Sequence, residues 1–167
     1  QRVLSVPIAE LPFGDSELAR TRIRHHGDKL AAVIIEPVVE REPPREWLVT
    51  LREETRRSGA VLILDEIKTG FRLAVGGAAE RYDIRPDLVV LGKALANGFP
   101  LAAVGGRREV MEQARRTWIS STLATEMVAL AAAEATVEVT VREGVPALLG
   151  IRGSRLLAGL NSLAARY

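Results

Sequence analysis

The chain has 167 residues, of which 47% are hydrophobic, 26% charged and 4% aromatic, and it contains no cysteine. The apolar content excludes a wholly disordered chain, and the length fits one domain of about 100–200 residues. A formal charge of +2 gives no reason to expect nucleic acid or an anionic membrane as partner, and the missing cysteines exclude disulfides, thiolate catalysis and zinc–cysteine sites.

Short apolar runs alternate with helical patterns along the first two thirds of the chain. The pattern predicts strands over 31–35, 61–64, 88–91 and 101–104, and helices over 17–25, 45–58, 78–82 and from 107. Unbroken apolar runs of this length are typical of strands buried on both faces of a parallel sheet. Strand–helix–strand units with short connections therefore predict an α/β fold with a mainly parallel sheet.

The last third of the chain has a different pattern. It predicts two helices, over 125–141 and 146–165, with a break near Gly144. The first of these helices is apolar almost all round, so we expect it to be buried or packed against a partner outside this chain.

Polar side chains follow three of the predicted strands at the point where each strand ends. They are Glu36, then Asp65 with Glu66, then Lys93. Because functional groups in open α/β sheets gather beyond the carboxyl ends of the strands, these side chains are candidates for one site. Lys93 lies in an otherwise apolar segment, and a desolvated amine is a usable nucleophile for Schiff-base chemistry. The alternative is a lysine that reaches solvent at a strand end, or one that pairs with Asp65.

Two further interpretations of these residues stay open. A carboxylate at Asp65 can face the ring nitrogen of a cofactor, but four apolar residues followed by Asp-Glu are also typical of the magnesium strand of nucleotidases. The sequence does not contain the phosphate loop of that class, because Asp87 and Ala94 stand where the loop motif requires Gly and Ser or Thr. Lys68 is a weaker nucleophile candidate, since Asp65 and Glu66 are close in sequence and would hold it protonated.

Hydroxyl groups gather before the helix that is predicted from residue 125. Ser120, Ser121 and Thr122 could bind a phosphate at a helix start, although simple capping by Thr122 or Thr125 is the plainer interpretation. His25 and His26 have no acidic partner at ligand spacing and are interpreted as surface residues.

Several motifs together resemble one family. They are DEIKTGFR over 65–72, PDL over 86–88 leading into GKAL over 92–95, NGFPL over 97–101 and the glycine pair 105–106. In this order they resemble the class-III aminotransferases, nearest the branch that contains glutamate-1-semialdehyde aminomutase. The resemblance covers about residues 31–135. It implies the cofactor pyridoxal 5'-phosphate (PLP) and the three-layer αβα large domain of the aspartate-aminotransferase fold (fold type I).

The resemblance also implies a role for each matching residue. Lys93 would form the Schiff base with the cofactor and later carry a proton. Asp65 would pair with the ring nitrogen, and Ile67 would pack on one face of the ring. Lys68 would lie beside the phenolic oxygen, where many members have Gln or Met, and Thr122 would bind the phosphate across a dimer interface.

Besides Lys68, two more positions depart from the family pattern. Arg41 stands where some relatives carry an acid or amide that faces the substrate, so those relatives do not indicate the substrate here. Glu126 adds a negative charge one turn from Thr122.

The resemblance implies that residues 1–167 are the central part of a PLP-binding large domain, with the N-terminal segment and the C-terminal small domain outside it. The expected function is transfer of an amino group between a small-molecule amino donor and a carbonyl compound, in a homodimer. The alternatives are an aminomutase or racemase of the same fold, or an inactive fragment that serves as a scaffold or dimerisation unit. We expect the isolated chain to be inactive. No signal-peptide pattern and no apolar run of about 20 residues is present, which favours a cytoplasmic protein with no membrane partner.

Overall fold

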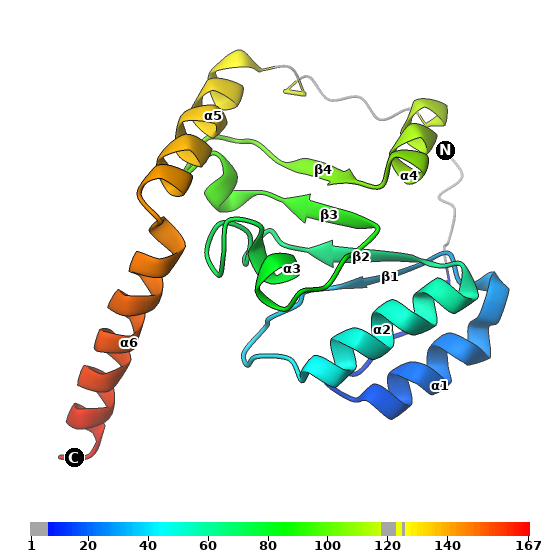
Figure 1. Ribbon diagram of the computed structural model, residues 1–167, viewed down its shortest axis with the longest axis horizontal. Helices are drawn as coiled ribbons and strands as arrows, with labels where there is room; N and C mark the ends of the chain where they lie inside the picture. The colour runs from blue at the N-terminus through cyan, green and yellow to red at the C-terminus, as the bar shows by residue number, and fades with distance from the viewer. Residues whose placement is uncertain (1–6, 118–122, 125) are drawn as a thin grey trace.

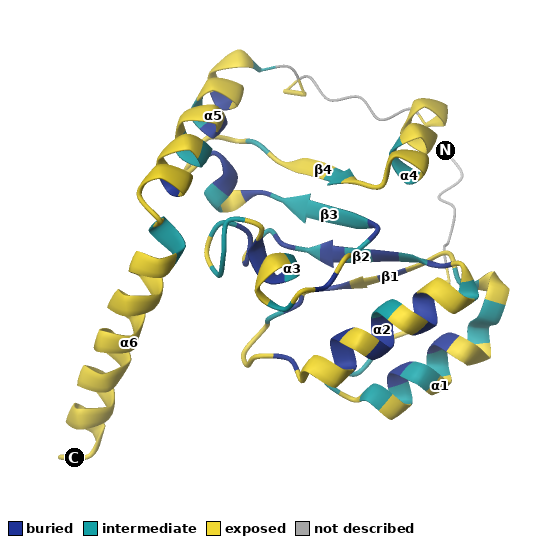
Figure 2. Ribbon diagram, in the orientation of Figure 1, coloured by how far each residue is buried: buried dark blue, intermediate teal, exposed yellow. Residues whose placement is uncertain are grey.

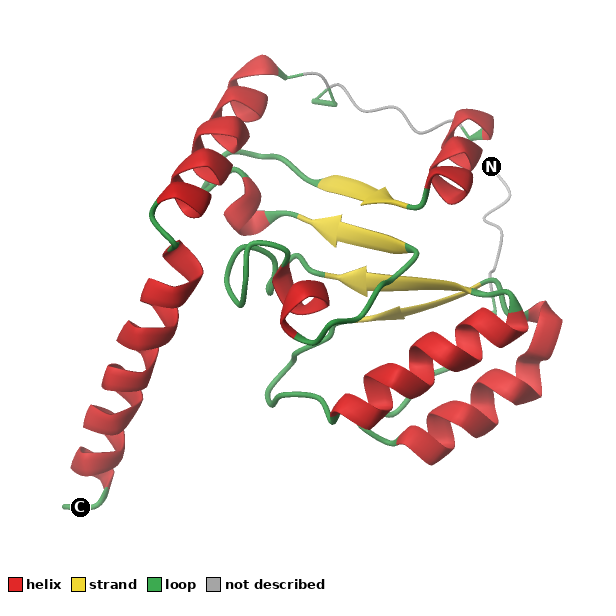
Figure 3. Cartoon of the chain, viewed as in Figure 1, coloured by secondary structure: helices red, strands yellow, loops and turns green. Residues whose placement is uncertain are grey.

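The computed structural model describes residues 7–117, 123–124 and 126–167. Helices α1 (Ser16–His26) and α2 (Arg45–Ser58) lie against a four-stranded sheet, and α5 (Met127–Arg142) and α6 (Val145–Ala164) end the chain (Figure 1; Figure 3). The shorter helical segments are α3 (Gly77–Arg81), α4 (Arg108–Met111), η1 (Gly27–Lys29), η2 (Lys93–Leu95) and η3 (Glu112–Arg116). The predicted helix bounds are confirmed to within about two residues, which is the usual uncertainty of a helix end.

The sheet has the strand order β1-β2-β3-β4. Strands β1 (Ala32–Ile35), β2 (Val61–Asp65) and β3 (Leu88–Leu91) are parallel, so the predicted α/β fold with a mainly parallel sheet is confirmed. Strand β4 (Ala103–Gly106) runs antiparallel to β3 and begins two residues later than predicted. The glycines that were expected to end this strand instead pair with Leu88 and Val89.

Helices α1 and α2 cover one face of the sheet. The core contains Leu62 and Leu64 of β2, which are fully buried, and Trp47, Leu48 and Leu51 of α2 (Figure 2). On β1 the burial alternates along the strand. Residue 34, an isoleucine on the opposite face, is 62% exposed. The expectation of burial on both faces is therefore wrong for β1 in the part of the protein that the structure describes.

The amino-terminal edge of β3 is fixed by a buried carboxylate. Asp87 accepts hydrogen bonds from the Leu62 amide (2.8 Å) and from the guanidinium groups of Arg52 (2.9 Å) and Arg107 (2.8 Å). Burial by itself would raise the pKa of Asp87, but these hydrogen bonds outweigh burial and lower it. Asp87 therefore ties α2, β2 and the segment after β4 to the start of β3.

Helices α5 and α6 are separated by Gly144, whose φ is +60°, as the predicted break required. Figure 1 shows α6 leading away from the sheet, and no residue of α6 is buried. The expectation of a buried first helix holds only for one stripe of α5, which buries Ala129, Ala133 and Thr140 while Met127 is 72% exposed. Within the described ranges, no helix combines the length and apolar character that crossing a membrane requires.

Candidate active site

The three polar strand ends lie along one edge of the sheet, as predicted. Parallel strands end at the same edge, and the register pairs Ile35 with Leu64 and Asp65 with Val90. Glu36 therefore follows β1, Asp65 ends β2, and Lys93 lies three residues beyond the partner of Asp65.

Lys93 opens η2 directly after β3, in an unusual backbone conformation. Its φ is +45°, in the left-handed region that a residue with a Cβ rarely adopts. The side chain is exposed, and among the residues that the structure describes its amine has no hydrogen bond and no ion pair. The expected desolvation of this amine is therefore not found: the side chain reaches solvent at the strand end, as one alternative had it, and the other alternative, a salt bridge to Asp65, is wrong. Backbone strain of this kind concentrates at functional sites, because the surrounding structure must hold it in place.

Asp65 lies at the carboxyl end of β2, on the sheet face opposite α1 and α2. One oxygen of its half-buried carboxylate, Oδ1, accepts a hydrogen bond from the Ile67 amide (3.0 Å). The other oxygen, Oδ2, has no partner within the described ranges. The Ile67 side chain lies 3.6 Å from the position that a Cβ on Gly92 would take. The carboxylate, the apolar side chain and the residue before Lys93 are thus neighbours.

Lys68 is held differently from Lys93. Its amine donates a hydrogen bond to the Val39 carbonyl (3.1 Å) and lies 3.3 Å from a carboxylate oxygen of Glu36. The expected pairing of Lys68 with Asp65 and Glu66 is wrong, because Glu36 on the neighbouring strand end is its acidic partner. This ion pair is about half exposed, so it is a weak one.

The start of α5 is capped by Glu126. Its two carboxylate oxygens accept hydrogen bonds from the amides of Val128 (2.8 Å) and Ala129 (2.6 Å). The extra negative charge noted in the sequence is therefore a helix cap. Thr122, the predicted phosphate ligand, and Thr125, its alternative as a cap, lie outside the described residues, as do Ser120 and Ser121.

Glu66 is part of the site's framework; the sequence placed it with Asp65 among the candidate site residues but gave it no role of its own. Its carboxylate is 1% exposed and accepts hydrogen bonds from the Thr69 hydroxyl and from the amides of Ala78 (2.9 Å) and Ala79 (2.8 Å). The sequence signal for this packing was the Gly76–Gly77 pair, because a residue with a Cβ at Gly77 would overlap the Glu66 carboxylate.

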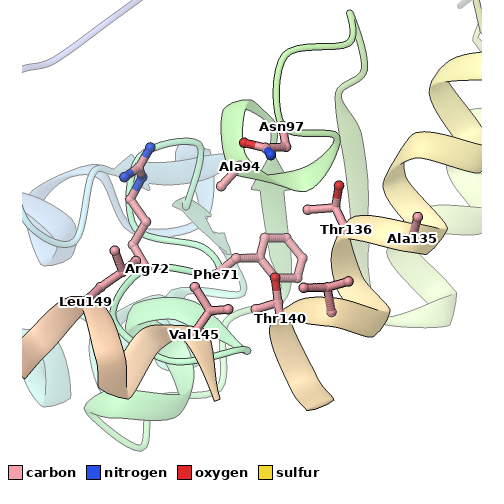
Figure 4. A pocket seen from close by; sticks show the side chains of 10 residues that line it. Phe71, Arg72, Ala94, Asn97, Ala135, Thr136, Thr140, Val145 and Leu149 are labelled. Carbon is pink, nitrogen blue, oxygen red and sulfur yellow. The ribbon is translucent and has the colours of Figure 1, made fainter. Parts of the chain in front are cut away.

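A pocket of about 470 Å³ opens beside η2, between the loop after β2 and the last two helices (Figure 4). Phe71, Arg72, Ala94 and Asn97 line one side, and residues of α5 and α6 line the other. Ala94 is the residue directly after Lys93. Figure 4 shows the Phe71 ring between the loop and α5.

Comparison with known proteins now identifies the family. The sequence profile of the class-III aminotransferases matches residues 12–167. The chain belongs to the class-III aminotransferases. This family is PLP-dependent, as the sequence motifs predicted.

Individual known proteins are similar to the chain over nearly its whole length. Glutamate-1-semialdehyde 2,1-aminomutase of Thermomicrobium roseum is 42% identical over 158 residues, which cover 90% of this chain and 37% of that protein. The FumI protein of a Sphingopyxis species, solved in its PLP internal aldimine form, superposes with a TM-score of 0.89 at 27% identity, over 95% of this chain and 40% of that one. The β-phenylalanine aminotransferase of Variovorax paradoxus gives 0.83 at 33% identity, over 99% and 40%. The chain thus spans less than half the length of these relatives.

Proposed function

We propose that the protein containing this chain is a PLP-dependent enzyme that moves an amino group between an amino donor and a carbonyl compound, with Lys93 as its essential amine. One observation carries the proposal. The strained, unpaired Lys93 follows the strand next to Asp65, whose Oδ2 has no partner in the described part of the chain. Lys29 and Lys68, the other two lysines, do not share this setting.

The residues at the strand ends fit the chemical groups of PLP. Asp65 Oδ2 would hold a proton at the ring nitrogen, and the Ile67 side chain would cover one face of the ring. When bound, PLP supplies an electron sink for the carbon that loses its proton. The Lys93 amine would take up that proton and return it at the second reacting carbon. This proton transfer needs an amine that is free of an ion pair.

Two predicted contacts with PLP remain part of the proposal. Lys68 would lie beside the phenolic oxygen, where its ion pair with Glu36 holds the amine at the β2 end of the site. Thr122 would bind the phosphate. A homodimer is also proposed, because α6 exposes apolar side chains such as Leu156, which is 65% exposed, and a second subunit would cover them.

A second candidate is an aminomutase, in which donor and acceptor carbons belong to one molecule. The names of the curated relatives favour it, since the Thermomicrobium protein at 42% identity is a glutamate-1-semialdehyde 2,1-aminomutase. A racemase of the same fold would use the same Lys93 and Asp65.

Product analysis of the purified full-length protein separates these reactions. With an amino donor and a prochiral ketone, an aminotransferase forms a new amine and consumes the donor. An aminomutase converts glutamate 1-semialdehyde alone into its isomer, with no acceptor present. A racemase would interconvert the enantiomers of one amino acid. Absence of all three activities in a protein that binds PLP would contradict the proposed function, and Lys93→Ala serves as the inactive control.

The isolated 167-residue chain is expected to show no turnover, because one face of its sheet is only partly covered and nearly all of α6 is exposed in the described structure. Turnover by the purified chain at the rate of the full-length protein would contradict this expectation.

A further inference from the structure

Glu66 lies between two residues of the proposed site, Asp65 and Ile67, and its own contacts lie elsewhere. Its carboxylate is directed to Thr69 and to the first amides of α3, whereas Asp65 and Ile67 lie toward Gly92 and the open sheet face. One short segment therefore carries an anchor on one side and two site residues on the other.

The backbone of Glu66 is fixed as firmly as its side chain. Its amide donates to the Val90 carbonyl on β3 (2.9 Å), and its carbonyl accepts from the Gly70 amide (2.8 Å). Together with the carboxylate, these contacts tie Glu66 to β3, to the turn after β2 and to α3. Asp65 and Ile67 are joined to Glu66 through the main chain. The contacts of Glu66 therefore hold the backbone of both neighbours in place.

The Glu66 carboxylate is satisfied by neutral donors only. Three hydrogen bonds come from a hydroxyl and two amides, and no arginine or lysine of the described chain forms an ion pair with it. A buried carboxylate is costly unless its oxygens are hydrogen-bonded, so loss of any donor weakens the whole cluster. Gly77 completes the arrangement, because a side chain there would overlap the carboxylate.

From this geometry we propose that Glu66 is a positioning residue: it sets the orientation of the Asp65 carboxylate and of the Ile67 side chain toward PLP. The inference rests on the proposed function. Glu66 itself would not contact the cofactor and would act through its two neighbours.

The test compares Glu66→Gln with Glu54→Gln in the full-length protein. Glu54 is a matched control, because it is equally buried (2% exposed) but lies on α2, where it pairs with Arg24. Two quantities are measured. One is the dissociation constant of PLP by absorbance titration, and the other is hydrogen exchange at the Ile67 amide in the cofactor-free protein. That amide reports directly on its hydrogen bond to Asp65.

For Glu66→Gln we expect the dissociation constant of PLP to rise about tenfold, and the Ile67 amide to exchange faster. The tenfold figure is the lower end of what the loss of a residue that supports a metal ligand costs in affinity, applied here to a residue that supports a cofactor contact. Glu54→Gln should lower thermal stability while leaving both quantities as in the wild type. If Glu66→Gln does not fold, Thr69→Val removes one donor and keeps the carboxylate, with the same directions expected at smaller size.

Two outcomes would overturn the inference: unchanged PLP binding and exchange in both Glu66→Gln and Thr69→Val, or an equal loss of PLP binding in Glu54→Gln. Failure of the wild-type protein to bind PLP would instead overturn the proposed function, so the two failures are distinguishable.

Discussion

The left-handed backbone at Lys93 predicts that two ways of removing its side chain give different stabilities. Lys93→Ala keeps a Cβ at a φ of +45°, whereas Lys93→Gly removes it. A Cβ in this region costs about 1–2 kcal/mol. Glycine offsets part of this gain, because it stabilises the unfolded chain by about 0.4–1 kcal/mol. Taking the middle of each range, the Lys93→Gly protein should be about 0.8 kcal/mol more stable than the Lys93→Ala protein.

Urea unfolding of the two cofactor-free variants measures this difference. With a slope of about 2 kcal/mol per molar urea, the midpoint of Lys93→Gly should lie about 0.4 M above that of Lys93→Ala. Lys29 provides the matched control. It is also exposed but does not have a positive φ, so Lys29→Gly should be less stable than Lys29→Ala. A Lys93→Gly midpoint at or below that of Lys93→Ala would show that the backbone of Lys93 is not strained.

Three further predictions concern the framework around the site. Asp87→Asn should cost about 2 kcal/mol in urea unfolding, below the usual figure for a broken buried pair because Arg52 and Arg107 both reach solvent. Folding lowers the pKa of Asp87, so its contribution to the free energy of unfolding is present above about pH 4 and is lost as pH falls through the folded pKa. The stability of Asp87→Asn should therefore fall less steeply in acid than that of the wild type. Equal pH dependence of stability in the two proteins would contradict this. Gly77→Ala should lose about 1–3 kcal/mol, and an unchanged melting temperature would argue against the Glu66 packing. Lys68→Met should change stability by less than about 1 kcal/mol, because its ion pair is exposed, and a larger loss on unfolding would show a stronger pair.

The fold could be predicted where one sequence pattern determines one structure. The apolar runs before Glu36, Asp65 and Lys93 indicated three strands, and parallel pairing then placed the three polar residues at one edge. The bounds of the fourth strand were harder to predict, because Gly105 and Gly106 have no side chains and so show no alternation of apolar and polar residues. Its pairing depends on Gly106, where a Cβ would overlap the Asp87 carbonyl.

The side-chain partners at the site could not be predicted from sequence distance. Asp65 and Glu66 are close to Lys68 along the chain, but strand alternation and the turn after β2 direct them away from it. Glu36, on another strand, takes that place. The framework role of Glu66 could not be predicted for a similar reason, because its donors at Ala78 and Ala79 come from a helix twelve residues and more downstream.

Lys93 is proposed as the amine that binds PLP. The most direct test incubates the protein with PLP, reduces it with borohydride and maps the modified peptides by mass spectrometry, with Lys93→Ala in parallel. We expect a pyridoxyl mass on Lys93 that is lost in the variant, while Lys29 and Lys68 stay largely unlabelled. Equal, light labelling of all three lysines would contradict this proposal.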